Sequence, residues 1–286
     1  MRSARAWAGR AWAAAAGAAL ASSLGMVPAF AEEPRDWEIG MVPGATPVFD
    51  RIESFHNELL IIITVITVFV LGLIVYAMWR FNAKRHPVPS QATHNTLLEV
   101  VWTAVPILIL VTIAIPSFKL LYYADRTEHA DMTLKVSGHQ WYWSYEYPDQ
   151  GDFTFDSNML PDDQAKAQHK LRLLSVDNPV VLPVGAVVRV LITGTDVIHS
   201  WYVPAAAVQE YAVVGRTNES WLQFEQEGTY YGQCNQICGV NHPFMPIEIH
   251  VVSKPDFDQW AAQAKQKFAA KDGEGASSVH LAAAAQ

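Results

Sequence analysis

Two long apolar stretches stand near the beginning of the chain. Residues 59–79 and 100–118 contain no charged side chain, and the second stretch is interrupted only by two prolines. A helix rises ~1.5 Å per residue, so either stretch can cross the ~30 Å hydrocarbon core of a membrane. Prolines are tolerated in such helices when neighbours satisfy the freed carbonyl groups. We therefore expect a two-helix transmembrane hairpin, with spans at 59–79 and 97–121 and a connecting loop at 80–96.

After the second span the pattern changes to short segments in which apolar and polar residues alternate. Alternation bounded by turn-forming residues predicts β-strands. We expect eight strands, at residues 133–136, 141–147, 180–182, 186–192, 199–203, 221–224, 229–232 and 247–252. Eight short strands within residues 122–254 predict an all-β Greek-key sandwich or barrel. The period becomes helical at residue 255, which predicts a short C-terminal helix and a tail within residues 255–286.

Residues 1–31 have the pattern of a secretory signal peptide. Three arginines precede an alanine-rich apolar stretch, and Ala29-Phe30-Ala31 is an A-x-A cleavage sequence. Cleavage would leave residues 32–58 as a periplasmic N-terminal segment, and an uncleaved N-terminal anchor is the alternative. The loop at 80–96 is basic and short, and such loops stay in the cytoplasm. The N-terminal segment and the C-terminal domain are therefore expected outside.

The composition agrees with a membrane protein and excludes several other classes. Of 286 residues 51% are hydrophobic and only 17% are charged, against roughly 25% charged in soluble domains. The net charge of −8 argues against a nucleic-acid surface, which would be basic. The part of the chain after the second span carries the whole of this charge. Such an acidic surface is either merely solvated or steers a basic protein partner.

The candidate chemistry lies between the last two predicted strands, where the chain has its only two cysteines, Cys234 and Cys238. His242 and Met245 follow them, and His199 stands upstream at the start of a predicted strand. Two thiolates, two imidazoles and a thioether are the soft donors that favour copper for electron transfer. Three other interpretations are a disulfide, a structural zinc site and chance clustering. A disulfide leaves the other donors unexplained, and zinc has no use for Met245.

Three longer motifs carry a resemblance to a known family. They are residues 138–147 (GHQWYWSYEY), 196–201 (DVIHSW) and 232–246 (GQCNQICGVNHPFMP). In these motifs the chain closely resembles subunit II of cytochrome c oxidase, and the resemblance extends over nearly all of the mature chain. It implies that the β domain is cupredoxin-like.

The resemblance also implies a binuclear copper centre, CuA. Cys234 and Cys238 would bridge the two copper ions. His199 and Met245 would complete one copper, and His242 and the main-chain carbonyl of Gln236 would complete the other. The centre would accept single electrons from cytochrome c and pass them to haem in the large subunit I. Oxygen reduction to water there is coupled to proton translocation in the family. Subunit III is a further expected partner, and the bacterial inner membrane is the expected location.

Other residues receive roles from the same resemblance. Trp141 corresponds to the position where electrons arrive from cytochrome c, although Trp141, Trp143, Tyr145 and Tyr147 on one strand face could equally be core packing. Glu99 corresponds to the mouth of a proton pathway, and its alternative role is a solvated helix-end residue. The expected docking surface for cytochrome c consists of Glu146, Asp149, Asp152, Asp156, Asp177 and Asp196.

One position departs from the family pattern. Gln236 stands between the cysteines where the family normally has a glutamate that reaches a magnesium ion at the subunit I interface. A neutral amide is a poorer ligand for Mg²⁺, so magnesium binding is in doubt. The alternatives to the oxidase are the corresponding subunit of a nitric oxide reductase, an oxidase with another donor, and a non-redox assembly scaffold. The chain lacks a C-x-x-C-H sequence, so no haem is expected to be attached to it.

Overall fold

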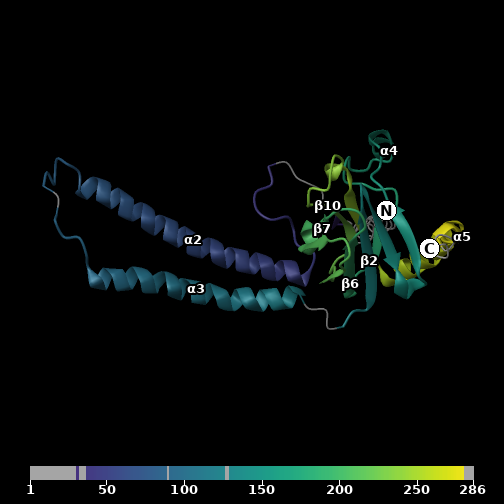
Figure 1. Ribbon diagram of the computed structural model, residues 1–286, viewed down its shortest axis with the longest axis horizontal. Helices are drawn as coiled ribbons and strands as arrows, with labels where there is room; N and C mark the ends of the chain where they lie inside the picture. Colours follow the sequence, from purple (N-terminus) through teal and green to yellow (C-terminus); the bar gives the residue numbers. More distant parts are fainter. Residues whose placement is uncertain (1–29, 32–36, 89, 126–128, 280–286) are drawn as a thin grey trace, which may run out of the picture.

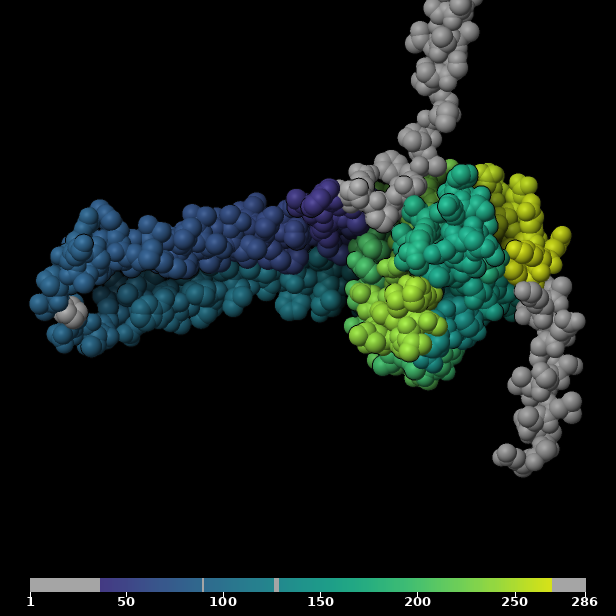
Figure 2. Space-filling model, turned by 90° about the horizontal axis from the view of Figure 1, so that it is seen from above, coloured from purple at the N-terminus to yellow at the C-terminus, as the bar shows by residue number. Residues whose placement is uncertain are grey.

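The computed structural model describes residues 30–31, 37–88, 90–125 and 129–279 and consists of a long helical hairpin and a β domain (Figure 1). The predicted signal peptide lies outside the described residues except for β1 (Phe30–Ala31), which pairs in parallel with β10. The hairpin projects from one side of the β domain in both views (Figures 1 and 2).

The hairpin consists of α2 (Pro47–Arg80) and α3 (Thr96–Asp125). Both helices are long and apolar enough to cross a membrane. Helix α2 begins well before the apolar stretch because Thr46 caps it: the Thr46 side chain accepts a hydrogen bond from the Phe49 N–H at 3.2 Å. Pro47 at the first helical position suits such a start. At the other end of the hairpin the Asn95 side chain accepts a hydrogen bond from the Leu98 N–H at 3.0 Å and starts α3.

The β domain is a sandwich of two mixed sheets and is cupredoxin-like, as predicted. One sheet has the order β5-β11-β10-β7-β8 with β1 beside β10, and the other has the order β4-β3-β2-β6-β9. The strands are β2 (Met132–His139), β3 (Tyr142–Tyr147), β4 (Phe153–Ser157), β5 (Val180–Pro183), β6 (Val188–Gly194), β7 (His199–Val203), β8 (Val208–Ala212), β9 (Asn218–Leu222), β10 (Gly228–Cys234) and β11 (Pro246–Val252).

Strands β4 and β8 are absent from the sequence prediction. Both lie at the ends of their sheets, and β8 has polar residues at its three central positions. An edge strand such as β8 therefore lacks a clear alternation of apolar and polar residues. Strand β4 does alternate, with Phe153, Phe155 and Ser157 buried, so its pattern was a usable signal that the prediction overlooked. The predicted strand at 141–147 is also one residue too long, because β3 begins at Tyr142 and Trp141 lies in the preceding turn.

The core lies between the sheets and holds the alternate residues of the strands. In β3 the buried positions are Trp143, Tyr145 and Tyr147, and their neighbours Tyr142, Ser144 and Glu146 face outward. Short segments of non-strand structure complete the domain: η1 (Pro148–Gln150), α4 (Asp162–Ala167), η2 (Pro204–Ala206) and η3 (His242–Phe244). Helix α5 (Lys254–Val279) begins one residue before the predicted start and packs Trp260 and Phe268 on β4.

The base of the hairpin is joined to the β domain by main-chain and ring contacts. The Thr46 hydroxyl donates to the Ala206 carbonyl at 2.9 Å, and the Ala45 N–H donates to the Ala205 carbonyl at 2.9 Å. From β9, the Trp221 Nε1–H donates to the carbonyl of Tyr123 at 3.2 Å, and the two rings pack edge to face. The domain is thereby held at one end of the hairpin.

Candidate metal centre

The ends of two adjacent strands position the first donors. His199 is the first residue of β7 and Cys234 is the last residue of β10, and the register pairs Cys234 with Trp201. The loop from residue 235 to 245 then folds back over the strand ends. Its return is fixed by a hydrogen bond from the Cys234 N–H to the Met245 carbonyl at 3.3 Å and by one from the Asn235 N–H to the Ser200 carbonyl at 3.1 Å.

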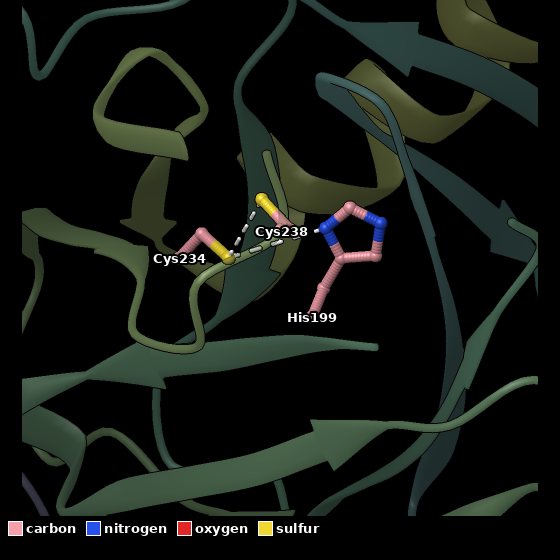
Figure 3. A group of neighbouring side chains, drawn as sticks. All are labelled: His199, Cys234 and Cys238. Carbon is pink, nitrogen blue, oxygen red and sulfur yellow. Dashed lines mark hydrogen bonds between the residues drawn. The ribbon is translucent and has the colours of Figure 1, made fainter. Parts of the chain in front are cut away.

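This folding brings all six predicted donors together. The sulfur atoms of Cys234 and Cys238 lie 3.8 Å apart, and His199 Nδ1 lies 4.0 Å from the Cys234 sulfur (Figure 3). On the other side, His242 Nδ1 and the Met245 sulfur each lie 3.6 Å from the Cys238 sulfur. The remaining predicted donor, the Gln236 carbonyl oxygen, lies 3.3 Å from the Cys234 sulfur. Each cysteine therefore has one imidazole and one weaker donor beside it.

The chemistry of these donors is that of a copper site. His199, Cys234, Cys238 and Met245 are buried, and His242 and Gln236 are half-buried. A disulfide has a sulfur–sulfur length of about 2.05 Å, whereas these cysteines are free. Thiolate and thioether ligands select copper, and imidazole suits it as well. The donors that converge here therefore fit copper, and a thioether at the centre distinguishes the set from the usual ligands of zinc.

The two thiols differ in acidity although they are neighbours. Burial raises the pKa of Cys234, but hydrogen bonding with His199 and with the neighbouring backbone outweighs burial and lowers the pKa to about 7. For Cys238, burial and the charge of the Cys234 thiolate both raise the pKa, to about 12. Two adjacent thiolates repel each other when no cation is present. Both can be ionised together only when bound metal supplies the compensating positive charge.

Asp196 holds one of the imidazoles in place. Its carboxylate lies 2.9 Å from His199 Nε2 and also accepts hydrogen bonds from the N–H groups of Val197 at 2.6 Å and Gln140 at 2.7 Å. These donors lower the pKa of Asp196 even though burial raises it. A carboxylate on Nε2 directs Nδ1 toward the sulfur atoms, as is usual for metal-binding histidines. Sequence reasoning missed this role, although the three-residue spacing from Asp196 to His199 was a usable signal.

Trp141 contacts the main chain of the ligand loop. Its Nε1–H donates to the carbonyl of Cys238 at 3.2 Å, and the Gln140 side-chain amide donates to the same oxygen at 2.8 Å. Gly239 makes this approach possible, because a Cβ atom there would lie 2.9 Å from the Trp141 ring. Trp141 lies in the turn before β3 and is half-buried, and it packs against the same core cluster as Trp143.

Trp143 supports the site from inside the core and was not predicted to do so. Its Nε1–H donates to the Met245 carbonyl at 3.3 Å, and its ring packs edge to face on His199 with 5.9 Å between the ring centroids. Gly138 leaves the room for His199, since a Cβ atom at Gly138 would lie 2.8 Å from the imidazole. The buried Trp143 ring therefore contacts both the segment of His199 and the segment of Met245.

Comparison with known proteins shows which family shares this arrangement. Residues 132–252 match the family model of the cytochrome c oxidase subunit II periplasmic domain, and residues 34–120 match that of the subunit II transmembrane domain. The chain belongs to the cytochrome c oxidase subunit II family. Membership of this family implies copper as the metal of the site.

Curated relatives named cytochrome c oxidase subunit 2 are similar in sequence to this chain over most of its length. A probable cytochrome c oxidase subunit 2 of Rickettsia bellii (strain RML369-C) is 51% identical over 241 residues, covering 84% of this chain and 89% of the relative. Cytochrome c oxidase subunit 2 of Oenothera berteroana is 45% identical over 240 residues, covering 82% and 93%. A crystal structure of the CoxB periplasmic domain of Bradyrhizobium japonicum is 49% identical, covers 50% of this chain and 99% of that chain, and has a TM-score of 0.47.

The acids predicted to dock cytochrome c differ in their surroundings in this subunit II chain. Asp149, Asp152, Asp156, Asp177 and Asp196 are exposed, whereas Glu146 is half-buried and paired with Lys135. Asp156 accepts a hydrogen bond from Ser144 at 2.7 Å on the outward face of β3 and β4. Asp149 and Asp177 accept hydrogen bonds from the backbone N–H groups of Thr133 and Asn158.

Glu99 lies far from the candidate metal donors of this subunit II chain. It is exposed in the first turn of α3, at the end of the hairpin opposite the β domain (Figure 1). Its backbone N–H donates to the Asn95 carbonyl at 3.0 Å, and its carbonyl accepts from the Thr103 hydroxyl at 2.8 Å. This location is compatible with both roles expected from the sequence, the mouth of a proton pathway and a solvated helix-end residue.

Proposed function

We propose that this chain is the electron-accepting subunit II of a cytochrome c oxidase in a bacterial inner membrane, with its β domain in the periplasm. The observation that carries the proposal is the convergence of two cysteines, two histidines, a methionine and a main-chain carbonyl in one largely buried site. All these donor positions are filled, which disfavours a non-redox assembly scaffold. Its partners would be the haem-containing subunit I, subunit III and a c-type cytochrome. Residues 1–31 would be removed as a signal peptide.

The proposed cofactor is a pair of copper ions, CuA. Cys234 and Cys238 would bridge the ions, His199 with Met245 would complete one, and His242 with the Gln236 carbonyl would complete the other. When bound, such a pair accepts and releases one electron at a time. The chain contributes ligands that are already close together and held by Asp196 and Trp143. Preorganised ligands limit the rearrangement that accompanies a change of charge.

Trp141 is the proposed point of arrival for electrons. It is the half-buried ring whose Nε1–H is bonded to the carbonyl of the ligand Cys238. A single hydrogen bond, from Trp141 to the Cys238 carbonyl, therefore links this ring to the ligand loop. Glu146, Asp149, Asp152, Asp156, Asp177 and Asp196 are proposed to attract a basic cytochrome c. Steering of this kind raises the association rate and weakens with salt.

Two further roles complete the proposal. Glu99, exposed at the cytoplasmic end of α3, would lie at the mouth of a proton pathway shared with subunit I. Magnesium at the subunit I interface is doubtful, because Gln236 offers a neutral amide where a carboxylate would be needed. A metal count on the intact complex would give copper and magnesium per subunit I.

The decisive experiment measures reduction of the intact complex by reduced cytochrome c in stopped flow. Wild type should contain copper in this subunit and be reduced rapidly, at a rate that falls steeply with ionic strength. Trp141→Phe should keep the copper and lower the rate roughly tenfold or more, a barrier of about 1.4 kcal/mol. Tyr142→Phe, beside it on the outward face, is the matched control. The proposal would be refuted by one zinc ion per chain, or by a reduction rate that changes neither with Trp141→Phe nor with ionic strength.

A further inference from the structure

A small pocket with a largely apolar lining and three charged side chains lies between the two helices of the hairpin, away from the proposed copper ligands. It has a volume of about 200 Å³ and is lined by Arg51, Ser54, Phe55, Glu58, Pro116, Lys119 and Leu120. The residues from α2 are spaced by three and four positions, as are those from α3, so each set shares one helix face. Two facing helix surfaces therefore form the pocket.

The pocket lies where a membrane would end. On α2 the charge-free stretch begins at Leu59, directly after the lining residue Glu58, and on α3 it ends at Phe118, directly before the lining residue Lys119. The β domain stands at this end of the hairpin (Figures 1 and 2). The lining residues are thus at the depth of the outer headgroups, with apolar helix surface on one side and the periplasmic domain on the other.

The charged groups of the pocket are available to a ligand. Within the described part of the chain, neither Lys119 nor Glu58 has an ion-pair partner, and both are exposed. Arg51 lies with its guanidinium carbon 3.5 Å from the centre of the Tyr123 ring, a contact that fixes the group without using its hydrogen-bond donors. Guanidinium and ammonium groups bind phosphate strongly.

We propose that this pocket binds the headgroup of a membrane phospholipid that carries a primary ammonium group, such as an ethanolamine phospholipid. Arg51 and Lys119 contact its phosphate, and Glu58 contacts its ammonium group. Glu58 is the reason for an ammonium group in the ligand, because a purely anionic headgroup would leave this carboxylate without a cationic partner from the lipid. Phe55, Pro116 and Leu120 lie beside the start of the acyl chains. Arg51 also stacks on Tyr123, which packs on Trp221 of the β domain, so the bound lipid supports the junction of hairpin and domain.

The test uses the intact oxidase complex, freed of lipid in detergent and titrated with dioleoyl phosphatidylethanolamine. Bound lipids are counted by native mass spectrometry. Lys119→Gln should weaken one binding event about tenfold, as expected for the loss of one charge-assisted contact. Glu58→Gln should weaken binding of the ethanolamine lipid but leave that of phosphatidylcholine, which has no ammonium hydrogens, unchanged. Lys84→Gln, in the loop at the opposite end of the hairpin, is the matched control.

Three results would overturn the proposal. One is equal lipid binding by wild type and Lys119→Gln. Another is inorganic phosphate that alone binds to the pocket as well as the lipid does, which would mean that a free anion is the ligand. The third is an electron microscopy map of the complex in which protein from another subunit fills the pocket. Copper content measured on each variant reports correct folding, and it depends on none of these residues.

Discussion

The hairpin and the β domain distribute their large apolar side chains in opposite ways. Trp143, in the β domain, is completely buried, whereas Trp79, near the end of α2, is 60% exposed. The apolar windows of both hairpin helices are unburied within this chain. A helix that is apolar all round needs a membrane or another subunit around it. The β domain instead buries its own core, and only it can hold metal ligands in fixed positions without outside help.

The largest expected effect compares these two tryptophans. Trp143→Ala should lower the free energy of unfolding of the β domain by about 3–5 kcal/mol, because it leaves a cavity beneath two donor segments. Trp79→Ala should leave the stability of the β domain unchanged. Hydrogen exchange of the β-strand amides in the intact complex measures both. Equal losses for the two variants would mean that the hairpin and the domain unfold as one unit.

The next effect concerns Glu248, a carboxylate that is only 2% exposed. Burial raises its pKa, but His250, the Val176 N–H and Lys170 outweigh burial and lower it. Its stabilisation is therefore present above the unfolded pKa of about 4.3 and is lost as the pH falls through the lower folded pKa. Glu248→Gln should cost roughly 1.5–3 kcal/mol at neutral pH and flatten the acid side of the stability profile.

The control for Glu248 is Glu219→Gln. Glu219 pairs with Arg189, but its side chain is 46% exposed, and exposed pairs contribute little. Thermal unfolding of the β domain between pH 3 and pH 7 separates the two variants. A Glu248→Gln variant with an acid profile identical to that of wild type would contradict this assignment.

Copper affinity sharpens the comparison within the site itself. Asp196→Asn should weaken copper binding about 10- to 100-fold, the usual effect of losing the partner of a metal-binding histidine. Asp156→Asn removes another exposed acid that has no hydrogen bond to a donor residue, and it should change only docking of the basic partner. Competition with a chelator measures the affinity. If both variants bind copper as wild type does, Asp196 does not position His199.

The smallest effect is expected at the junction of the two regions. Thr46→Ala removes both the cap of α2 and the hydrogen bond to Ala206, at a cost of about 1 kcal/mol. Thr67→Ala removes a hydroxyl that only bonds back to Ile63 within the helix, and should cost less. Hydrogen exchange at the first turn of α2 should speed up in the first variant alone. Unchanged exchange there would show that Pro47 suffices to start the helix.

The regular strands and the apolar helices were predictable because their patterns are local. The strand predicted at 199–203 matches β7 in full, although four of its five residues are buried and its alternation is incomplete. The start of α2 was missed because Thr46 and Pro47 precede the apolar stretch and signal a helix by capping rather than by period. Strand β8 was missed because its three central residues are not buried, whereas the alternation of β4 was present in the sequence and was overlooked.

The candidate donors of this protein could be identified before the fold was known, because Cys234, Cys238, His242 and Met245 lie in one loop and His199 lies in a recognisable motif. The surroundings of these donors depend on the three-dimensional fold. Asp196 bonds His199, Trp143 contacts two donor segments, and Trp141 both packs against the core and donates to the Cys238 carbonyl. The identity of the donors is a local property of the chain. The residues that contact the donors are set by strand register and by the close approach that Gly138 and Gly239 allow.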